Sequence, residues 1–181
     1  DIMDGLSAGV GAVSASCLLV VALLQGDQTI AVMLVALIGS LLGFLKYNWH
    51  PARIYMGDTG AMLIGLLLGA MAMIGKYPSD HPLSLLTPVF IVGIPIFDTL
   101  FVMYIRYRRG LPIFWGSPDH IAIRLRHWGL SVPQIVITSY VATGIVGAIG
   151  LAMLSVSLEV GWILCAGTVG TLLLVTMMLK K

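Results

Sequence analysis

Six long apolar runs, which together contain a single charged residue, most strongly limit what this chain can fold into. The charge is Asp98, and the runs cover residues 5–26, 28–45, 59–75, 82–105, 128–158 and 160–179. A membrane-spanning helix needs about 20 apolar residues, so the second and third runs must extend into their flanking loops. The runs are continuous rather than alternating, which favours helices over a β-barrel. We predict an all-α, polytopic membrane protein with about six transmembrane helices in one domain, residues 1–181.

The composition agrees with a location in the bilayer. Hydrophobic residues make up 59% of the chain and charged residues 10%, which leaves too little polar surface for a water-soluble globule. Both cysteines, Cys17 and Cys165, lie inside apolar runs, where we expect free thiols. The net charge of +2 and the lack of an extended basic tract exclude nucleic acid as a partner, whereas membrane lipid is expected.

The basic residues predict how the chain is oriented. Alternating helices place nine of the ten basic residues on one side and leave Lys76 on the other. The nine are Lys46, Arg53, Arg106, Arg108, Arg109, Arg124, Arg126, Lys180 and Lys181. By the positive-inside rule this side is cytoplasmic, and it also carries Asp1, Asp4, Asp58, Asp119 and His120. We therefore expect a cytoplasmic active-site face.

A short polar segment, residues 48–65, lies between two of the apolar runs. Pro51 should end the preceding helix, and Gly57 and Gly60 allow backbone amides to approach a ligand closely. Asp58 lies between these glycines at the membrane surface. The combination suits a phosphorylated substrate and its metal, although Asp58 can also be the N-cap of the third helix.

The loop 106–131 is too long for a simple hairpin connection and should contain a helix on the membrane surface. Asp119 is the predicted N-cap of that helix, and Arg124 and Arg126 are expected in solvent. An interfacial helix with solvated arginines is the simpler reading. His120, at the entrance of the helix, can instead meet anionic ligand groups together with the arginines.

Three further acids allow both structural and functional interpretations. Asp1 and Asp4, three residues apart, would share one helix face and can line a metal or sugar site. They can equally cap the first helix. Asp98 lies within a span, where an ionisable group is costly and usually faces a partner or an aqueous cavity. An arginine partner would make its role structural.

Taken together, four sequence blocks resemble the polyprenyl-phosphate N-acetylhexosamine-1-phosphate transferases, a family of bacterial membrane enzymes that includes phospho-N-acetylmuramoyl-pentapeptide-transferase. The blocks are DIMDGLSAG at 1–9, NWHPARIYMGDTGA at 48–61, PIFDT at 95–99 and SPDHIAIRL at 117–125. The chain departs from the family at Ile2, where glycine is usual. It also has Ala122 and Ile123 in place of two histidines of the last motif and keeps His120. The chain resembles the C-terminal portion of a longer transferase.

The resemblance implies transfer of N-acetylhexosamine-1-phosphate from a UDP-sugar to polyprenyl (undecaprenyl) phosphate, with release of UMP. UDP-N-acetylglucosamine is the expected donor, and the expected cofactor is Mg²⁺, with Mn²⁺ as a substitute. The reaction would take place at the cytoplasmic face of the bacterial inner membrane, in cell-wall, lipopolysaccharide or O-antigen biosynthesis.

By the same resemblance, seven residues would form the site. Asp58 would be the metal ligand and, with His120, catalytic; His120 and Arg124 would contact the pyrophosphate. The nucleotide and sugar would be bound by Asn48, Tyr55, Asp1 and Asp4, with Tyr55 stacking on the uracil.

Two other classes remain open. The CDP-alcohol phosphotransferases need an Ala-Arg pair after Asp-Gly, but Leu6 and Ser7 follow Gly5 here. A non-catalytic transporter or channel subunit agrees with the 21 glycines and with Asp98, although the polar residues gather at one membrane face.

The glycines of the fifth run also bear on assembly. Gly144, Gly147 and Gly150 can pack against a second subunit, giving a homodimer, or against further helices of the same chain outside residues 1–181.

Overall fold

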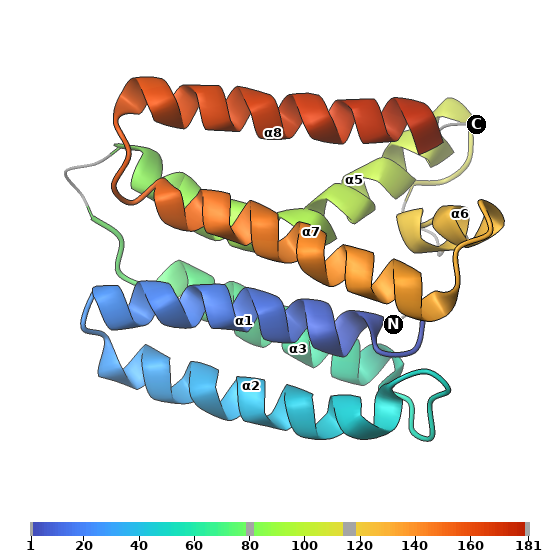
Figure 1. Ribbon diagram of the computed structural model, residues 1–181, viewed down its shortest axis with the longest axis horizontal. Coiled ribbons are helices and arrows are strands. Elements are labelled where there is room, and N and C mark those ends of the chain that lie inside the picture. Colours follow the sequence, from blue (N-terminus) through green and yellow to red (C-terminus); the bar gives the residue numbers. More distant parts are fainter. Residues whose placement is uncertain (1, 79–81, 114–118, 180–181) are drawn as a thin grey trace.

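The computed structural model describes residues 2–78, 82–113 and 119–179, and every regular element in these ranges is a helix (Figure 1). The first three helices, α1 (Leu6–Leu24), α2 (Gln28–Asn48) and α3 (Gly57–Ile74), run back and forth across the bundle. The remaining elements are η1 (Pro82–Leu86), α4 (Thr87–Ile91), α5 (Gly93–Arg108), α6 (Ile121–His127), α7 (Val132–Ala152) and α8 (Leu158–Leu179). The predicted all-α fold is confirmed.

Five of these helices, α1, α2, α3, α7 and α8, are long and apolar enough to cross a membrane. The predicted fourth span is different, because Pro82–Ile91 and Gly93–Arg108 meet at an angle of 71°. The prediction of about six spans therefore agrees with the structure if this bent pair crosses once, but the fourth span is broken rather than continuous.

The break has a local cause in the sequence. Pro95 has no backbone N–H, so it cannot donate to the carbonyl of Ile91 four residues earlier. That carbonyl instead accepts a hydrogen bond from the Ser14 hydroxyl of α1, at 3.0 Å. The side chain of a neighbouring helix thus satisfies the backbone group that the proline leaves free.

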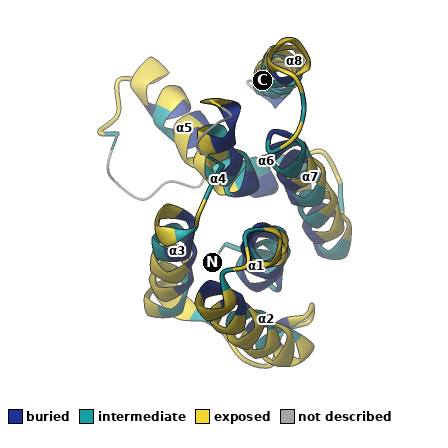
Figure 2. Ribbon diagram, turned by 90° about the vertical axis from the view of Figure 1, so that its left-hand side faces the viewer, coloured by how far each residue is buried: buried dark blue, intermediate teal, exposed yellow. Residues whose placement is uncertain are grey.

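Helix α1 lies at the centre of the bundle and contacts α2, α3, α4 and α7. Buried residues concentrate on it and on the sides of its neighbours that face it (Figure 2). Small residues permit this close packing: a Cβ added at Gly9 would lie 1.9 Å from the Tyr140 ring of α7.

The glycines of α7 pack inside this chain. A Cβ at Gly147 would come within 2.6 Å of the Cys17 sulfur on α1, and one at Gly150 within 2.8 Å of Phe90 on α4. Gly144 faces Val13 of α1 at 3.9 Å. Among the described residues, Gly147 and Gly150 thus pack closely against helices of this chain, and the homodimer stays a prediction.

Helix α8 lies at the edge of the bundle (Figure 2). Only 6% of its most apolar stretch is buried, and it touches the rest of the chain near its two ends. Gly161 packs against Leu83 and Met153 at one end, and Leu179 packs near Phe101 and Ile105 at the other.

The ends of α2 and α5, the starts of α1 and α3, and all of α6 lie at the same end of the bundle (Figure 1). We call this the polar end and define it by Asp4, Asp58, Arg109 and His120. The sequence prediction that these groups share one end is confirmed, and so is the presence of a helix within the loop 106–131.

Candidate active site

A cavity of about 610 Å³ lies between α1, α3, α5 and α6. Most of its wall is apolar, with residues such as Val10, Ile64, Leu68 and Ile94. Its ionisable lining groups come from three different elements and are Asp58, Asp98 and His120. The cavity therefore joins a charged region at the polar end to an apolar region between the spans.

Asp58 stands in the first turn of α3 with an exposed side chain. The helix is preceded by Met56 as its N-cap, so the reading of Asp58 as the cap is wrong. Gly57 has a φ of +69°, a backbone conformation that a side chain would strain, which explains a glycine at this turn. Asp58 makes no hydrogen bond or ion pair with another residue that the structure describes, so its carboxylate is free to bind a ligand.

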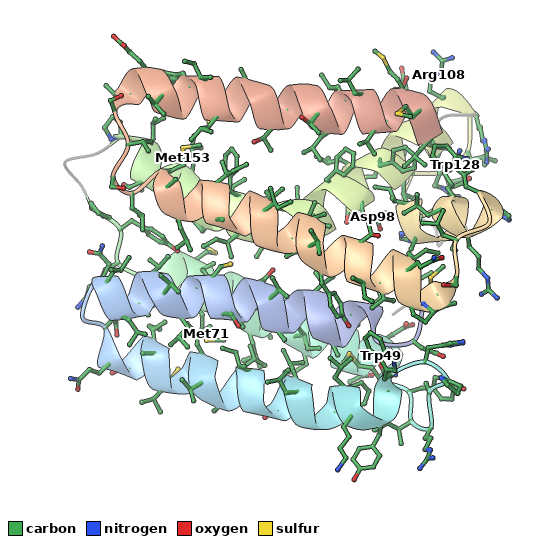
Figure 3. The ribbon with its side chains drawn as sticks, in the orientation of Figure 1. Trp49, Met71, Asp98, Arg108, Trp128 and Met153 are labelled. Carbon is green, nitrogen blue, oxygen red and sulfur yellow. The ribbon has the colours of Figure 1, made fainter. Side chains whose placement is uncertain are left out.

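Asp98 and His120 form a hydrogen-bonded pair at the cavity wall (Figure 3 labels Asp98). The Oδ2 atom of Asp98 lies 2.6 Å from Nδ1 of His120, and its Oδ1 accepts a hydrogen bond of 2.9 Å from the N–H of Ile121. The side-chain partner of Asp98 is therefore a histidine and not the arginine that would have made its role structural. Sequence reasoning noted the acid within a span, but 22 positions separate the two residues and nothing in the sequence paired them.

Arg124 is nearly buried, so the expectation that it lies in solvent is wrong, whereas Arg126 is exposed as predicted. The Arg124 guanidinium pairs with Asp119 at 2.9 Å and donates to the Leu179 carbonyl at 2.7 Å. Asp119 also pairs with Arg109 and is not the N-cap of α6, a position that His120 occupies. Arg124 thus joins α6 to the end of α8 and lies outside the cavity lining.

Asp4 precedes α1, which begins at Leu6, so the placement of this acid on a helix face is wrong. Gly5 is the N-cap, and Asp4 makes no capping bond to the helix. The carboxylate instead accepts from Ala52 N–H at 3.1 Å and pairs with His50 at 2.9 Å. The hydrogen bond from His50, followed by that from Ala52, holds the pKa of Asp4 below its usual range. Its predicted partner, Asp1, lies outside the described residues.

Asn48 is buried at the end of α2 and links two of the sequence blocks. Its side-chain carbonyl accepts from Gly5 N–H at 2.9 Å, and its amide donates to the Ile54 carbonyl at 2.9 Å. Tyr140 donates from its hydroxyl to the carbonyl of Gly5. These bonds fix the loop that leads to Tyr55, whose side chain is 75% exposed.

A divalent cation has a suitable carboxylate here but no complete cage. Within the described ranges, no three His, Cys, Asp or Glu side chains come together as a cluster that can hold a metal ion. Mg²⁺ is commonly held by one or two carboxylates together with substrate phosphates, so a single free carboxylate fits its needs. Asp58 is that carboxylate, because Asp98 is already engaged by His120 and Ile121.

Comparison with known proteins places these residues in a family context. Residues 1–76, which include Asp58, match the family described as glycosyl transferase family 4. The chain is 39% identical over 140 residues to a probable undecaprenyl-phosphate N-acetylglucosaminyl 1-phosphate transferase of Bacillus subtilis. That match covers 77% of this chain and 39% of the relative.

Two further relatives extend the match. A decaprenyl-phosphate N-acetylglucosaminephosphotransferase of Mycobacterium leprae is 38% identical over 165 residues, 81% of this chain and 42% of the relative. A phospho-N-acetylmuramoyl-pentapeptide-transferase of Desulforudis audaxviator is 36% identical over 155 residues, 84% of this chain and 44% of the relative. The chain thus spans about two fifths of the length of these relatives.

Proposed function

Because the chain belongs to glycosyl transferase family 4, we propose that the protein transfers N-acetylhexosamine-1-phosphate from a UDP-sugar to polyprenyl phosphate and releases UMP. We propose UDP-N-acetylglucosamine as the donor and undecaprenyl phosphate as the acceptor. The Bacillus subtilis relative is named for N-acetylglucosaminyl 1-phosphate and undecaprenyl phosphate, and the Mycobacterium leprae relative for N-acetylglucosamine phosphate and decaprenyl phosphate. The product would feed cell-wall or surface-polysaccharide synthesis.

One observation carries this proposal: the cavity that holds Asp58, Asp98 and His120 has an otherwise mostly apolar wall that runs between the spans. A polyprenyl phosphate has the same division, with a charged head and an apolar tail. The head would lie at the polar end near the ionisable groups, and the tail along the walls formed by α1, α3 and α5.

The reaction forms one P–O bond and breaks another. An oxygen of the polyprenyl phosphate attacks the sugar-bearing phosphorus of the UDP-sugar, and the bond from that phosphorus to the UMP oxygen breaks. Phosphoryl transfer depends chiefly on alignment and on electrostatic stabilisation, so no covalent enzyme intermediate is needed.

In this proposal Asp58 would hold Mg²⁺, or Mn²⁺ in its place, together with phosphate oxygens of the substrates. When bound, the ion reduces repulsion between the two anionic substrates and stabilises charge on the bridging oxygen. His120, which also lines the cavity, would contact the phosphates through Nε2, which makes no hydrogen bond to another described residue.

The nucleotide would lie over the loop between α2 and α3. The exposed ring of Tyr55 is available for stacking on the uracil. Asn48 uses its carbonyl and one amide hydrogen within the protein, so a direct contact with the uracil would use its second amide hydrogen. Asp4 and Asp1 would border the sugar and nucleoside. Arg124 lies outside the cavity lining and pairs with Asp119, so its predicted contact with the pyrophosphate would require it to leave that partner.

We place the polar end at the cytoplasmic face of the bacterial inner membrane, because the basic residues gather there and UDP-sugars are made in the cytoplasm. A homodimer has no support from Gly144, Gly147 and Gly150, which pack within the chain. Nothing observed favours the transporter reading, since the described polar groups lie mainly at one end.

The test is transfer of radiolabelled sugar phosphate from UDP-N-acetylglucosamine to undecaprenyl phosphate by the full-length protein, with and without Mg²⁺. We expect Mg²⁺-dependent product that Asp58→Ala abolishes while the variant stays folded. Asp27→Asn is the matched control, because Asp27 caps α2 at the opposite end of the bundle and asparagine is an equally good cap. Normal turnover by Asp58→Ala would contradict the metal-ligand role. Absence of both product and nucleotide binding in the wild type would contradict the function.

A further inference from the structure

We propose that Asp98 is a positioning residue that fixes the His120 ring through Nδ1 and leaves Nε2 directed at the phosphates in the cavity. The inference rests on the proposed function and extends it to a residue with no assigned role. Its basis is the pair of contacts that Asp98 makes across two elements of the fold.

Asp98 points toward the start of α6. It lies on α5, and both of its carboxylate oxygens bond to the start of α6, one to Nδ1 of His120 and one to the N–H of Ile121. The two contacts are 2.6 Å and 2.9 Å long. Together they fix the carboxylate in two directions, so His120 has a partner that is itself held in place.

A carboxylate within an apolar span is unfavourable unless it has partners, and a single bond to Ile121 would already tie α5 to α6. The same loop offers arginines, yet Arg109 and Arg124 pair with Asp119 instead. Asp98 is therefore matched to a histidine whose second ring nitrogen is left for the cavity, whereas the two arginines are drawn to Asp119.

An ionised carboxylate only accepts hydrogen bonds, so Nδ1 of His120 must carry the proton between them. Nε2 is then the ring atom left for the substrate. The His120 side chain is 29% exposed and lines the cavity, so Nε2 can donate to a phosphate oxygen when the ring is protonated and accept a proton when it is neutral.

Asp98→Asn separates positioning from simple folding. The asparagine carbonyl can still accept from Ile121 N–H, so the anchor of α6 is retained. Its amide group then faces Nδ1 as a donor, which makes Nδ1 the acceptor and moves the ring proton to Nε2. The variant keeps the shape of the site but presents the wrong tautomer to the substrate.

A spectroscopic measurement tests the contact without depending on turnover. With ¹⁵N-histidine in the full-length protein in nanodiscs, we expect Nδ1–H for His120 in the wild type and the Nε2–H tautomer in Asp98→Asn. His50 belongs to the separate pair with Asp4, so its signals should not move and serve as an internal control. His120 signals that are the same in both proteins would overturn the proposal.

A kinetic measurement tests the consequence. Asp98→Asn should lower kcat at least about tenfold while KM for the UDP-sugar changes less than about threefold, because the loss falls on the transition state. In the background of His120→Ala, adding Asp98→Asn should cause little further loss of kcat, since both changes disable the same Asp98–His120 pair. Asp27→Asn should retain wild-type activity.

Two outcomes overturn the proposal and are distinct from failure of the proposed function. Wild-type kcat in a folded Asp98→Asn protein, or full additivity with His120→Ala, would mean that Asp98 does not act through His120. Absence of transferase activity in the wild type would contradict the function, and the tautomer measurement would still decide the contact.

Discussion

Two carboxylate–histidine pairs occur at the polar end, and they differ in what they face. In each pair the carboxylate lies close to Nδ1 of the histidine and also accepts from a backbone N–H, Asp4 from Ala52 and Asp98 from Ile121. The Asp98 pair lines the cavity, whereas His50 of the Asp4 pair is 43% exposed and outside its lining. The same local chemistry therefore holds a loop in one place and a cavity residue in the other.

The difference follows from the elements that carry the two acids. Asp4 and His50 lie in short connections before α1 and after α2, where the pair closes one loop against another. Asp98 lies in α5, and a carboxylate there must find partners among the groups that reach into the bundle. Location in the bundle, rather than residue type, decides which pair can meet a substrate.

The largest difference between the two pairs should appear when the histidine of each is removed, with the greater loss for His120. We expect His120→Ala to lower kcat about 100-fold, the scale of a lost phosphate contact or proton transfer in the transition state. His50→Ala should leave kcat within about threefold of the wild-type value, because Asp4 keeps its bond to Ala52. The variant should raise KM for the UDP-sugar. Steady-state kinetics with both substrates varied provides the measurement. Equal losses in the two variants would remove the distinction between the pairs.

A third acid, Asp119, shows what a structural ion pair looks like at this end. Arg124→Met takes away the nearly buried arginine that pairs with Asp119, together with the bond from Arg124 to the Leu179 carbonyl. Arg109 still pairs with Asp119 in this variant. We expect the free energy of unfolding to fall by about 2 kcal/mol, less than for a fully orphaned buried charge. Thermal unfolding in detergent measures this, with Arg126→Met as the exposed control. Lost activity at unchanged stability would instead favour the predicted pyrophosphate contact.

The sequence predicted the fold class and the common end of the polar groups, because both depend on apolar run length and on charge position. The break at Ile91 was not predicted, although Pro95 was visible, since a proline alone does not reveal the Ser14 hydroxyl that completes it. The partners of Asp98 and Asp4 were likewise out of reach. Each lies more than 20 residues away, and a single sequence carries no signal that pairs them.

The same limit explains the errors in the loop 106–131. Arginines on a short amphipathic helix are usually solvated, which favoured placing Arg124 in water. The end of α8 covers that position and offers the Leu179 carbonyl, which only the tertiary packing reveals. Asp58 was read correctly as an acid beside a glycine turn, but its place one residue inside α3 depends on the backbone of Gly57.

The support of α5 provides a smaller test of the comparison. Ser14→Ala would leave the Ile91 carbonyl without its side-chain donor at the break that precedes the Asp98 segment. We expect a loss of about 1 to 2 kcal/mol in unfolding free energy, as for a buried acceptor left unsatisfied. Ser16→Ala on the same helix is the control, because the Ser16 hydroxyl bonds only within its own helix. Equal melting temperatures for the two variants would contradict the role given to Ser14.

The smallest expected effect is a pH dependence confined to the Asp4 pair. The pKa of Asp4 is lowered from 3.8 by its bonds to His50 and Ala52, so the folded state favours the ionised carboxylate. Its stabilising contribution is therefore fully present above pH 3.8 and is lost as the pH falls through the lower folded-state value. Because the side chain is partly exposed, we expect a local change in the loop rather than unfolding. Hydrogen exchange at the Ala52 amide, corrected for its intrinsic pH dependence, should lose protection in that window in the wild type. Asp4→Asn should lack this transition, and a persistent transition in the variant would assign it to another group.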